Sequence, residues 1–166
     1  MTKFYSLSYK ESRTFIFAAL FIVGNVALPQ LCHLVPGGGL TWLPIYFFTL
    51  VGAYKYGWRV GLLTAMASPL VNHLLFGMPA ANVLLPIMIK STLLALAASY
   101  VATRFKKVSL LLLVAVVLAY QVAGSFIESA ITGSLATGFQ DFSIGLPGMA
   151  LQVVGGYLII KYVLHK

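Results

Sequence analysis

The 166-residue chain has very few acidic residues and almost no cysteine. Three residues are Asp or Glu, and Cys32 is the single cysteine. One cysteine excludes an internal disulfide and a cysteine-rich metal site. The chain also lacks the HExxH, GxSxG and phosphate-loop motifs, which excludes ATP hydrolysis by a phosphate loop. We therefore expect no metal, no cofactor and no enzymatic activity in this chain itself.

Charged residues of either sign are scarce, because they make up 8% of the chain against 60% hydrophobic residues. A soluble domain usually contains about 25% charged and about 45–50% apolar residues. A soluble fold cannot hide so much apolar surface, so the composition predicts an all-α integral membrane protein. The net charge of +8 lies beside apolar segments, where the positive-inside rule explains it more simply than nucleic-acid binding does.

Six apolar segments come close to the roughly 20 residues that a helix needs to cross a bilayer. We expect a single domain over residues 1–166, folded as a compact bundle of six transmembrane helices. The first run is long enough to span and no small-x-small site follows it, so we expect no cleaved signal peptide. The predicted spans are about 14–34, 41–56, 58–76, 82–104, 109–134 and 145–164.

All Lys and Arg residues except one fall on the same side of these six spans. The positive-inside rule then places both termini in the cytoplasm and the connections 35–40, 77–81 and 133–148 outside. The residues on the predicted inner side are Lys3, Lys10, Arg13, Lys55, Arg59, Arg104, Lys106, Lys107, Lys161 and Lys166.

Lys90 is the exception, and Glu128 is an acidic residue inside another span. A charge at the centre of a membrane helix costs about 2.5–3.5 kcal/mol on insertion scales. Each is therefore expected to face the bundle interior, a partner or a water-filled cavity. At 1.5 Å per residue both lie about 9–12 Å below the outer ends of their spans. The two can thus meet at one level in the outer half.

Other polar residues gather in the same outer half. Gln121, Ser125 and Glu128 share one helical face, and Gln152 lies in the outer third of the last span. We predict a substrate pocket that opens to the outside and is closed below. Two alternatives stay open, namely an ion pair of Lys90 and Glu128 that only fixes helix packing, and a proton relay. Further candidate pocket residues are Asn72, His73, Asn82, Trp42 and His33.

Glycines indicate two features of the backbone, a mobile connection and a site of close helix packing. Three consecutive glycines in the first outer connection predict a mobile gate over the pocket, since glycine permits unusual backbone conformations. A four-residue spacing of small residues predicts close packing of the third span against its neighbours. The gate residues are Gly37, Gly38 and Gly39, and the packing residues are Gly57, Gly61 and Ala65.

Two segments carry a resemblance to a known family. They are LPIYFFTLVGAYKYGWRVGLLTAMASPLVNHLLFGMP, with Pro44 and Gly52 at familiar spacing, and LPGMALQVVGGYLIIKYV at the end of the chain. Together with six short spans and positive termini, they make nearly the whole chain resemble a substrate-binding S component of an energy-coupling factor (ECF) vitamin transporter.

The resemblance implies capture of a vitamin or related micronutrient on the extracellular side of a bacterial or archaeal cytoplasmic membrane. It implies a lipid environment, a transmembrane T component and two cytoplasmic ATPases as partners. The family often docks its T component on an alanine-x-x-x-alanine surface of the first helix. This chain departs from that pattern with Thr14 and Ala18, and Ala19 beside them.

Three rival interpretations stay open at this point. The first is a stand-alone ion-coupled secondary transporter or channel. The second is an intramembrane enzyme that uses Ser125 or His73. The third is a structural membrane subunit in which Lys90 and Glu128 only hold helices together.

Overall fold

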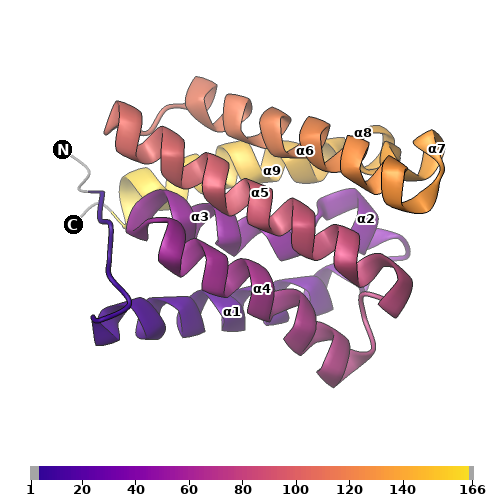
Figure 1. The fold of residues 1–166 in the computed structure, drawn as a ribbon, viewed down its shortest axis with the longest axis horizontal. Coiled ribbons are helices and arrows are strands. Elements are labelled where there is room, and N and C mark those ends of the chain that lie inside the picture. The colour runs from indigo at the N-terminus through magenta and orange to yellow at the C-terminus, as the bar shows by residue number, and fades with distance from the viewer. Residues whose placement is uncertain (1–3, 165–166) are drawn as a thin grey trace.

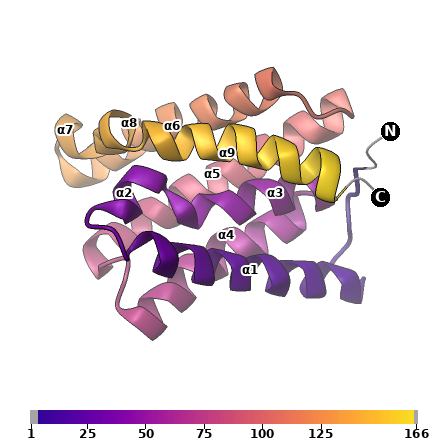
Figure 2. The same ribbon diagram turned by 180° about the vertical axis from the view of Figure 1, so that it is seen from behind.

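The computed structural model describes residues 4–164, and this part of the chain contains helices and no strand. The long helices form one bundle, in which α9 covers the face opposite α4 and α5 (Figures 1 and 2). The all-helical prediction is confirmed. The elements are α1 (Ser12–Cys32), α2 (Gly38–Trp42), the 3₁₀ turn η1 (Pro44–Tyr46), α3 (Phe47–Tyr56), α4 (Trp58–Phe76), α5 (Ala81–Phe105), α6 (Leu110–Thr132), α7 (Leu135–Gly138), α8 (Gln140–Ile144), α9 (Leu146–Leu158) and the π-helical turn η2 (Ile159–Val163).

Four stretches of the described chain are long and apolar enough to cross a membrane. They are α1, α5, α6 and the continuous helical stretch Leu146–Val163 that α9 and η2 form. Large apolar side chains such as Ile16, Leu111 and Val154 are exposed on their outer faces. An apolar outer surface of this kind suits lipid, and it indicates a multi-pass membrane protein.

The predicted second span is not one continuous helix. Residues 41–56 contain the end of α2, a bend at Leu43, the turn η1 and then α3. Leu43 has a φ of 44°, in the left-handed region, and it precedes Pro44, whose ring disfavours the right-handed helical conformation in the residue before it. At 10 residues, α3 reaches about 15 Å, which is half the thickness of the hydrocarbon core.

The described cations other than Lys90 gather at one end of the bundle, which we call the basic end. Both ends of the described part of the chain lie at this end, whereas α2, α7 and α8 lie at the opposite end, which we call the loop end (Figure 1). The N-terminal segment is held there because Tyr5 N donates to Lys55 O at 2.9 Å and Arg59 Nη1 donates to Leu7 O at 3.3 Å. Lys3 and Lys166 lie outside the described residues.

Helix α3 lies at the centre of the bundle. Its residues Leu50 and Val51 are fully buried, with helices α1, α4, α5 and α9 around them (Figures 1 and 2). A Cβ atom added at Gly61 would lie 2.5 Å from Ala53 Cβ and 3.0 Å from Ala95 Cβ. The backbone of α4 therefore packs directly against α3 and α5, as the spacing of small residues predicts.

A proline in α1 leaves one backbone carbonyl without its helical hydrogen bond, and a side chain from another helix supplies the missing donor. Pro29 has no N–H, so the carbonyl of Asn25, four residues before it, loses its helical donor. Asn72 of α4 replaces that donor, because its Nδ2 donates to Asn25 O at 2.9 Å and to Ser68 O at 2.9 Å. The side chain of Asn25 in turn donates to Thr49 Oγ1 at 3.0 Å. This network fixes α1 against α3 and α4.

Asn72→Leu is expected to lower the free energy of unfolding by about 1–3 kcal/mol, because it leaves the carbonyl of Asn25 buried without a donor. Chemical unfolding of the purified protein in detergent measures the loss. Asn82→Leu is the matched control, since Asn82 is exposed at the start of α5 and its replacement should change stability by no more than about 0.5 kcal/mol. Equal losses in both variants would contradict the proposed role of the Asn72 network.

Candidate functional site

Lys90 lies on the buried face of α5, with only 2% of its side chain exposed. Its Nζ is 2.5 Å from Glu128 Oε2 on α6 and 2.7 Å from Asp141 Oδ2 on α8. We call Lys90, Glu128 and Asp141 the ion cluster. The structure thus brings together the two ionisable residues that the sequence places at one depth, and it adds a third residue from the connection between α6 and α9.

The position of Lys90 depends on a glycine in α6. A Cβ atom added at Gly124 would lie 2.4 Å from Lys90 Cγ, so only glycine leaves room for the lysine stem against the helix. Glu128 follows four residues later on the same helical face. The pattern Gly124–Glu128 therefore accommodates the apolar stem of the lysine and, one turn further on, pairs with its ammonium group.

Sequence reasoning missed Asp141 as a site residue, because it assigned residues 133–148 to an outer connection without structure. The structure places α7 and α8 there. A Cβ at Gly138 would lie 2.0 Å from Ser129 Oγ and 2.5 Å from Ser125 O, so the end of α7 packs tightly on α6. This contact precedes Asp141 by three residues. The scarcity of acidic residues could have pointed to Asp141 as a site residue, since it is one of three in the whole chain.

Beside the ion cluster lie polar side chains that are completely buried. Gln121, Ser125 and Gln152 have no exposed surface. The Tyr120 hydroxyl donates to Gln152 Oε1 at 2.9 Å. Both amide atoms of Gln121, Ser125 Oγ and Gln152 Nε2 have no hydrogen-bond partner within the described protein. Buried polar groups without a partner are uncommon in proteins, and each needs an explanation, of which a ligand site is one.

A cavity of about 370 Å³ opens at the loop end, and we call it the loop-end cavity. Its walls come from the end of α1, from α2, η1, α4 and α5, from the connections beside α2 and before α5, and from α8. Most of the lining is apolar, and His33, Tyr46, Asn72 and Asp141 add polar groups. Its volume falls in the range of about 300–1,000 Å³ that is usual for small-molecule sites.

The other predicted pocket residues take different places. His33 and Asn72 line the cavity, whereas Trp42 and Asn82 are exposed and do not line it. His73 Nδ1 lies 2.8 Å from Pro79 O, at the edge of the connection before α5.

Lys90, Glu128 and the buried amides of Gln121 and Gln152 do not line the cavity. Asp141 is the residue of the ion cluster that also lines the cavity. Tyr46 lines the cavity as well, and its ring centroid is 5.4 Å from that of Tyr120, the residue bonded to Gln152. Asp141 and Tyr46 therefore connect the cavity with the polar groups deeper in the bundle.

The three predicted gate residues form the start of a packed element. Gly37 has a φ of 73°, and Gly38 and Gly39 begin α2. A Cβ at Gly38 would lie 2.0 Å from Cys32 O, and one at Gly39 would lie 2.5 Å from His33 Nε2. Glycine is thus required at position 38 by the close approach of the α1 backbone, whereas at position 39 the His33 ring could shift. Movement of this segment stays a prediction.

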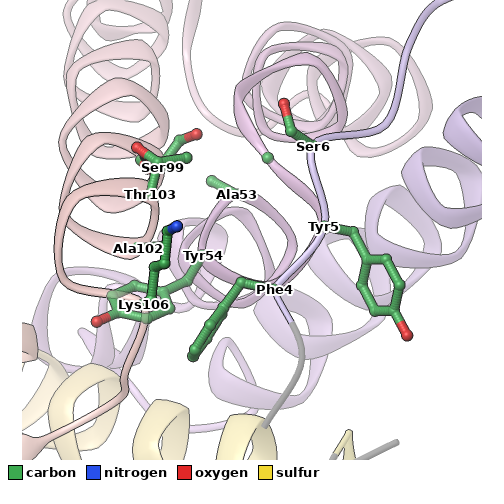
Figure 3. A pocket seen from close by; sticks show the side chains of 10 residues that line it. Phe4, Tyr5, Ser6, Ala53, Tyr54, Ser99, Ala102, Thr103 and Lys106 are labelled. Carbon is green, nitrogen blue, oxygen red and sulfur yellow. Dashed lines mark hydrogen bonds between the residues drawn. The ribbon is translucent and has the colours of Figure 1, made fainter.

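A second cavity, of about 400 Å³, lies at the basic end between the N-terminal segment, α3 and α5. Figure 3 shows its lining, in which the Lys106 side chain lies near Tyr54 and Ala102. The Tyr54 hydroxyl donates to Lys107 O at 2.8 Å. Along α3, the fully buried Leu50 and Val51 separate this cavity from the loop-end cavity.

Two of the three predicted docking residues on α1 face the bundle interior. Thr14 is fully buried and its Oγ1 donates to Ser8 O at 2.6 Å, and Ala18 is buried in the hydrophobic core. Ala19 lies on the exposed face of α1. The small-residue spacing of Thr14 and Ala18 therefore serves packing within this chain, and a partner on α1 would meet Ala19 and its exposed neighbours.

No known protein family, no curated protein and no solved structure matches this chain.

Proposed function

We propose that the chain is the substrate-binding subunit of an ECF-type importer, which captures a small vitamin or related micronutrient. The observation that carries this proposal is the loop-end cavity, which lies in a bundle of apolar helices and has a volume suited to a small molecule. The buried polar side chains that Asp141 and Tyr46 connect with this cavity supply the hydrogen-bonding groups that orient such a ligand.

The distribution of charge supports an orientation in the membrane. Under the positive-inside rule the basic end faces the cytoplasm, so the loop-end cavity opens to the extracellular side. The proposed arrangement has six crossings, with both termini in the cytoplasm of a bacterial or archaeal cell. In this arrangement the bend at Leu43 lets η1 and α3 share one crossing with α2.

The residues of the site take distinct parts in this proposal. Asp141 contacts the ligand, and Lys90 and Glu128 hold Asp141 in place. Gln121, Ser125 and Gln152 orient the ligand through Asp141 and Tyr46, which connect them with the cavity, and α2 closes over it. The chain lacks a phosphate loop, so a T component and two ATPases drive release into the cytoplasm.

Mass spectrometry of small molecules released from the gently purified full chain tests this function. We expect one compound in a stoichiometric amount, or saturable binding of one member of a vitamin panel. Uptake of that compound by cells should require an ATPase and a T component. If the purified protein is empty and no vitamin binds, the proposed function is wrong.

The ion cluster favours one second candidate, a stand-alone ion-coupled transporter. A lysine between two carboxylates inside a membrane protein is an arrangement that proton-coupled carriers use. This candidate predicts uptake that stops when an uncoupler removes the proton gradient while cellular ATP is maintained. Uptake that instead continues under the uncoupler and stops on ATP depletion supports the importer.

A further inference from the structure

The ion cluster carries one more negative charge than positive charge. Lys90 supplies one positive charge, and Glu128 and Asp141 supply one negative charge each, which leaves a formal charge of −1. All three side chains are largely buried, with 2%, 12% and 14% of their surfaces exposed. A buried charge without a full counter-charge is unfavourable, because the protein interior solvates it poorly.

The other cations of the described chain are too far away to balance this charge. The remaining described Lys and Arg residues lie at the basic end, at the opposite end of the helices (Figure 1). His33 borders the loop-end cavity from the end of α1, and His73 contacts Pro79 O outside the cluster. The surplus negative charge therefore lies at the loop end, beside the cavity.

Asp141 presents this charge to the cavity. Among the described residues that line the cavity, Asp141 is the single acidic residue, and none is Lys or Arg. Lys90 does not line the cavity, and its ammonium group is already covered by two carboxylate oxygens. An anion in the cavity would meet Asp141 without reaching Lys90, whereas a cation would gain a direct partner.

The rest of the cavity indicates what the cation would be attached to. Leu40, Ile45, Val83 and Ile87 give apolar walls, and the ring of Tyr46 lies beside them. Apolar and aromatic walls with one charged group are typical of sites for amphipathic small molecules. The face of a tyrosine ring also attracts cations.

We propose that the loop-end cavity selects a small organic cation, with an apolar or aromatic body and one positively charged group bound by Asp141. This inference rests on the proposed function of the cavity as a ligand site. Lys90 acts as a positioning residue, because it holds Asp141 at the cavity wall. Its single positive charge balances one of the two carboxylates, so the cluster keeps a net charge of −1.

The test compares three probes of nearly equal shape, namely benzamidine (+1), benzamide (0) and benzoate (−1). Each is titrated against the purified full chain in lipid nanodiscs at constant ionic strength. We expect benzamidine to bind at least tenfold more tightly than the other two. Asp141→Asn should remove this preference. Glu11→Gln is the matched control, since it removes an exposed carboxylate at the basic end and should leave the preference unchanged.

Several results would overturn the inference. They are equal binding of the three probes, tighter binding of benzoate, no binding of benzamidine, or a preference that survives Asp141→Asn. A co-purified anionic vitamin would overturn the inference while supporting the proposed function. Binding of benzamidine that depends on Asp141, together with failure of every vitamin, would support the inference and refute the importer.

Discussion

Lys90→Met is expected to destabilise the folded protein by about 3–5 kcal/mol, as removal of one partner from a buried ion pair does elsewhere. The methionine keeps the apolar stem against Gly124 but removes the ammonium group. Glu128 and Asp141 would then face each other in a poorly solvated site without their common counter-charge. We expect a lower melting temperature in detergent and a smaller yield of folded protein.

A triple variant separates the stability of the ion cluster from its binding role. Lys90→Met combined with Glu128→Gln and Asp141→Asn removes all three charges, so no unpaired charge is left buried. Replacing a complete buried ion network by uncharged side chains of similar volume removes the cost of burying the charges, and with well-packed hydrophobic residues such a replacement is often neutral for stability. We expect the triple variant to recover most of the lost melting temperature yet to lose the preference for benzamidine. If the triple variant recovered both the melting temperature and the preference for benzamidine, the cluster would have only a packing role. If Lys90→Met alone were as stable as the parent, the expected cost of leaving the two carboxylates without their counter-charge would be contradicted.

Val83→Trp is expected to weaken ligand binding by at least tenfold while the protein stays folded. Val83 lines the loop-end cavity and is only partly buried, so an indole ring at this position extends into the space of the ligand. The same substitution at Val154 adds an indole to the exposed face of α9, away from the cavity, and should leave binding unchanged. Titration with benzamidine and with the vitamin identified by mass spectrometry measures both variants.

Normal binding by Val83→Trp would show that the ligand does not enter this cavity. The preference for cations would then have to arise elsewhere, and both proposals about the loop end would fall together. A loss of binding in the Val154 variant as well would indicate general damage to the bundle, and melting temperatures of the two variants detect such damage directly.

Local patterns in the sequence predicted most of the helices. The prediction of 58–76 coincides with α4 (Trp58–Phe76), and that of 82–104 differs from α5 (Ala81–Phe105) by one residue at each end. Apolar runs and glycine or proline breaks are local features, and they determine where a membrane helix begins and ends. The break inside the second predicted span was not predicted, because hydropathy does not detect the bend that Leu43 and Pro44 impose inside an apolar run.

The site was predictable where helical periodicity applies and not where distant segments meet. The depth of Lys90 and Glu128 follows from counting residues along two helices, and the structure brings the two side chains together. The contact of Lys90 with Asp141 joins residues 51 positions apart and depends on α7 packing against α6. No periodic pattern encodes that contact. The placement of Thr14 and Ala18 inside the bundle also depends on which face of α1 meets its neighbours.

The separation of charge between the two ends has a consequence for the protein in an energised membrane. The basic end carries eight described cations, namely Lys10, Arg13, Lys55, Arg59, Arg104, Lys106, Lys107 and Lys161. In a membrane held at 100 mV, negative inside, moving one positive charge outward across the whole potential requires about 2.3 kcal/mol. In the proposed orientation the basic end faces the cytoplasm, so an inverted molecule would place all eight on the outer side. The membrane voltage therefore acts in the same direction as the insertion machinery, and each molecule is expected to keep a single orientation throughout its lifetime.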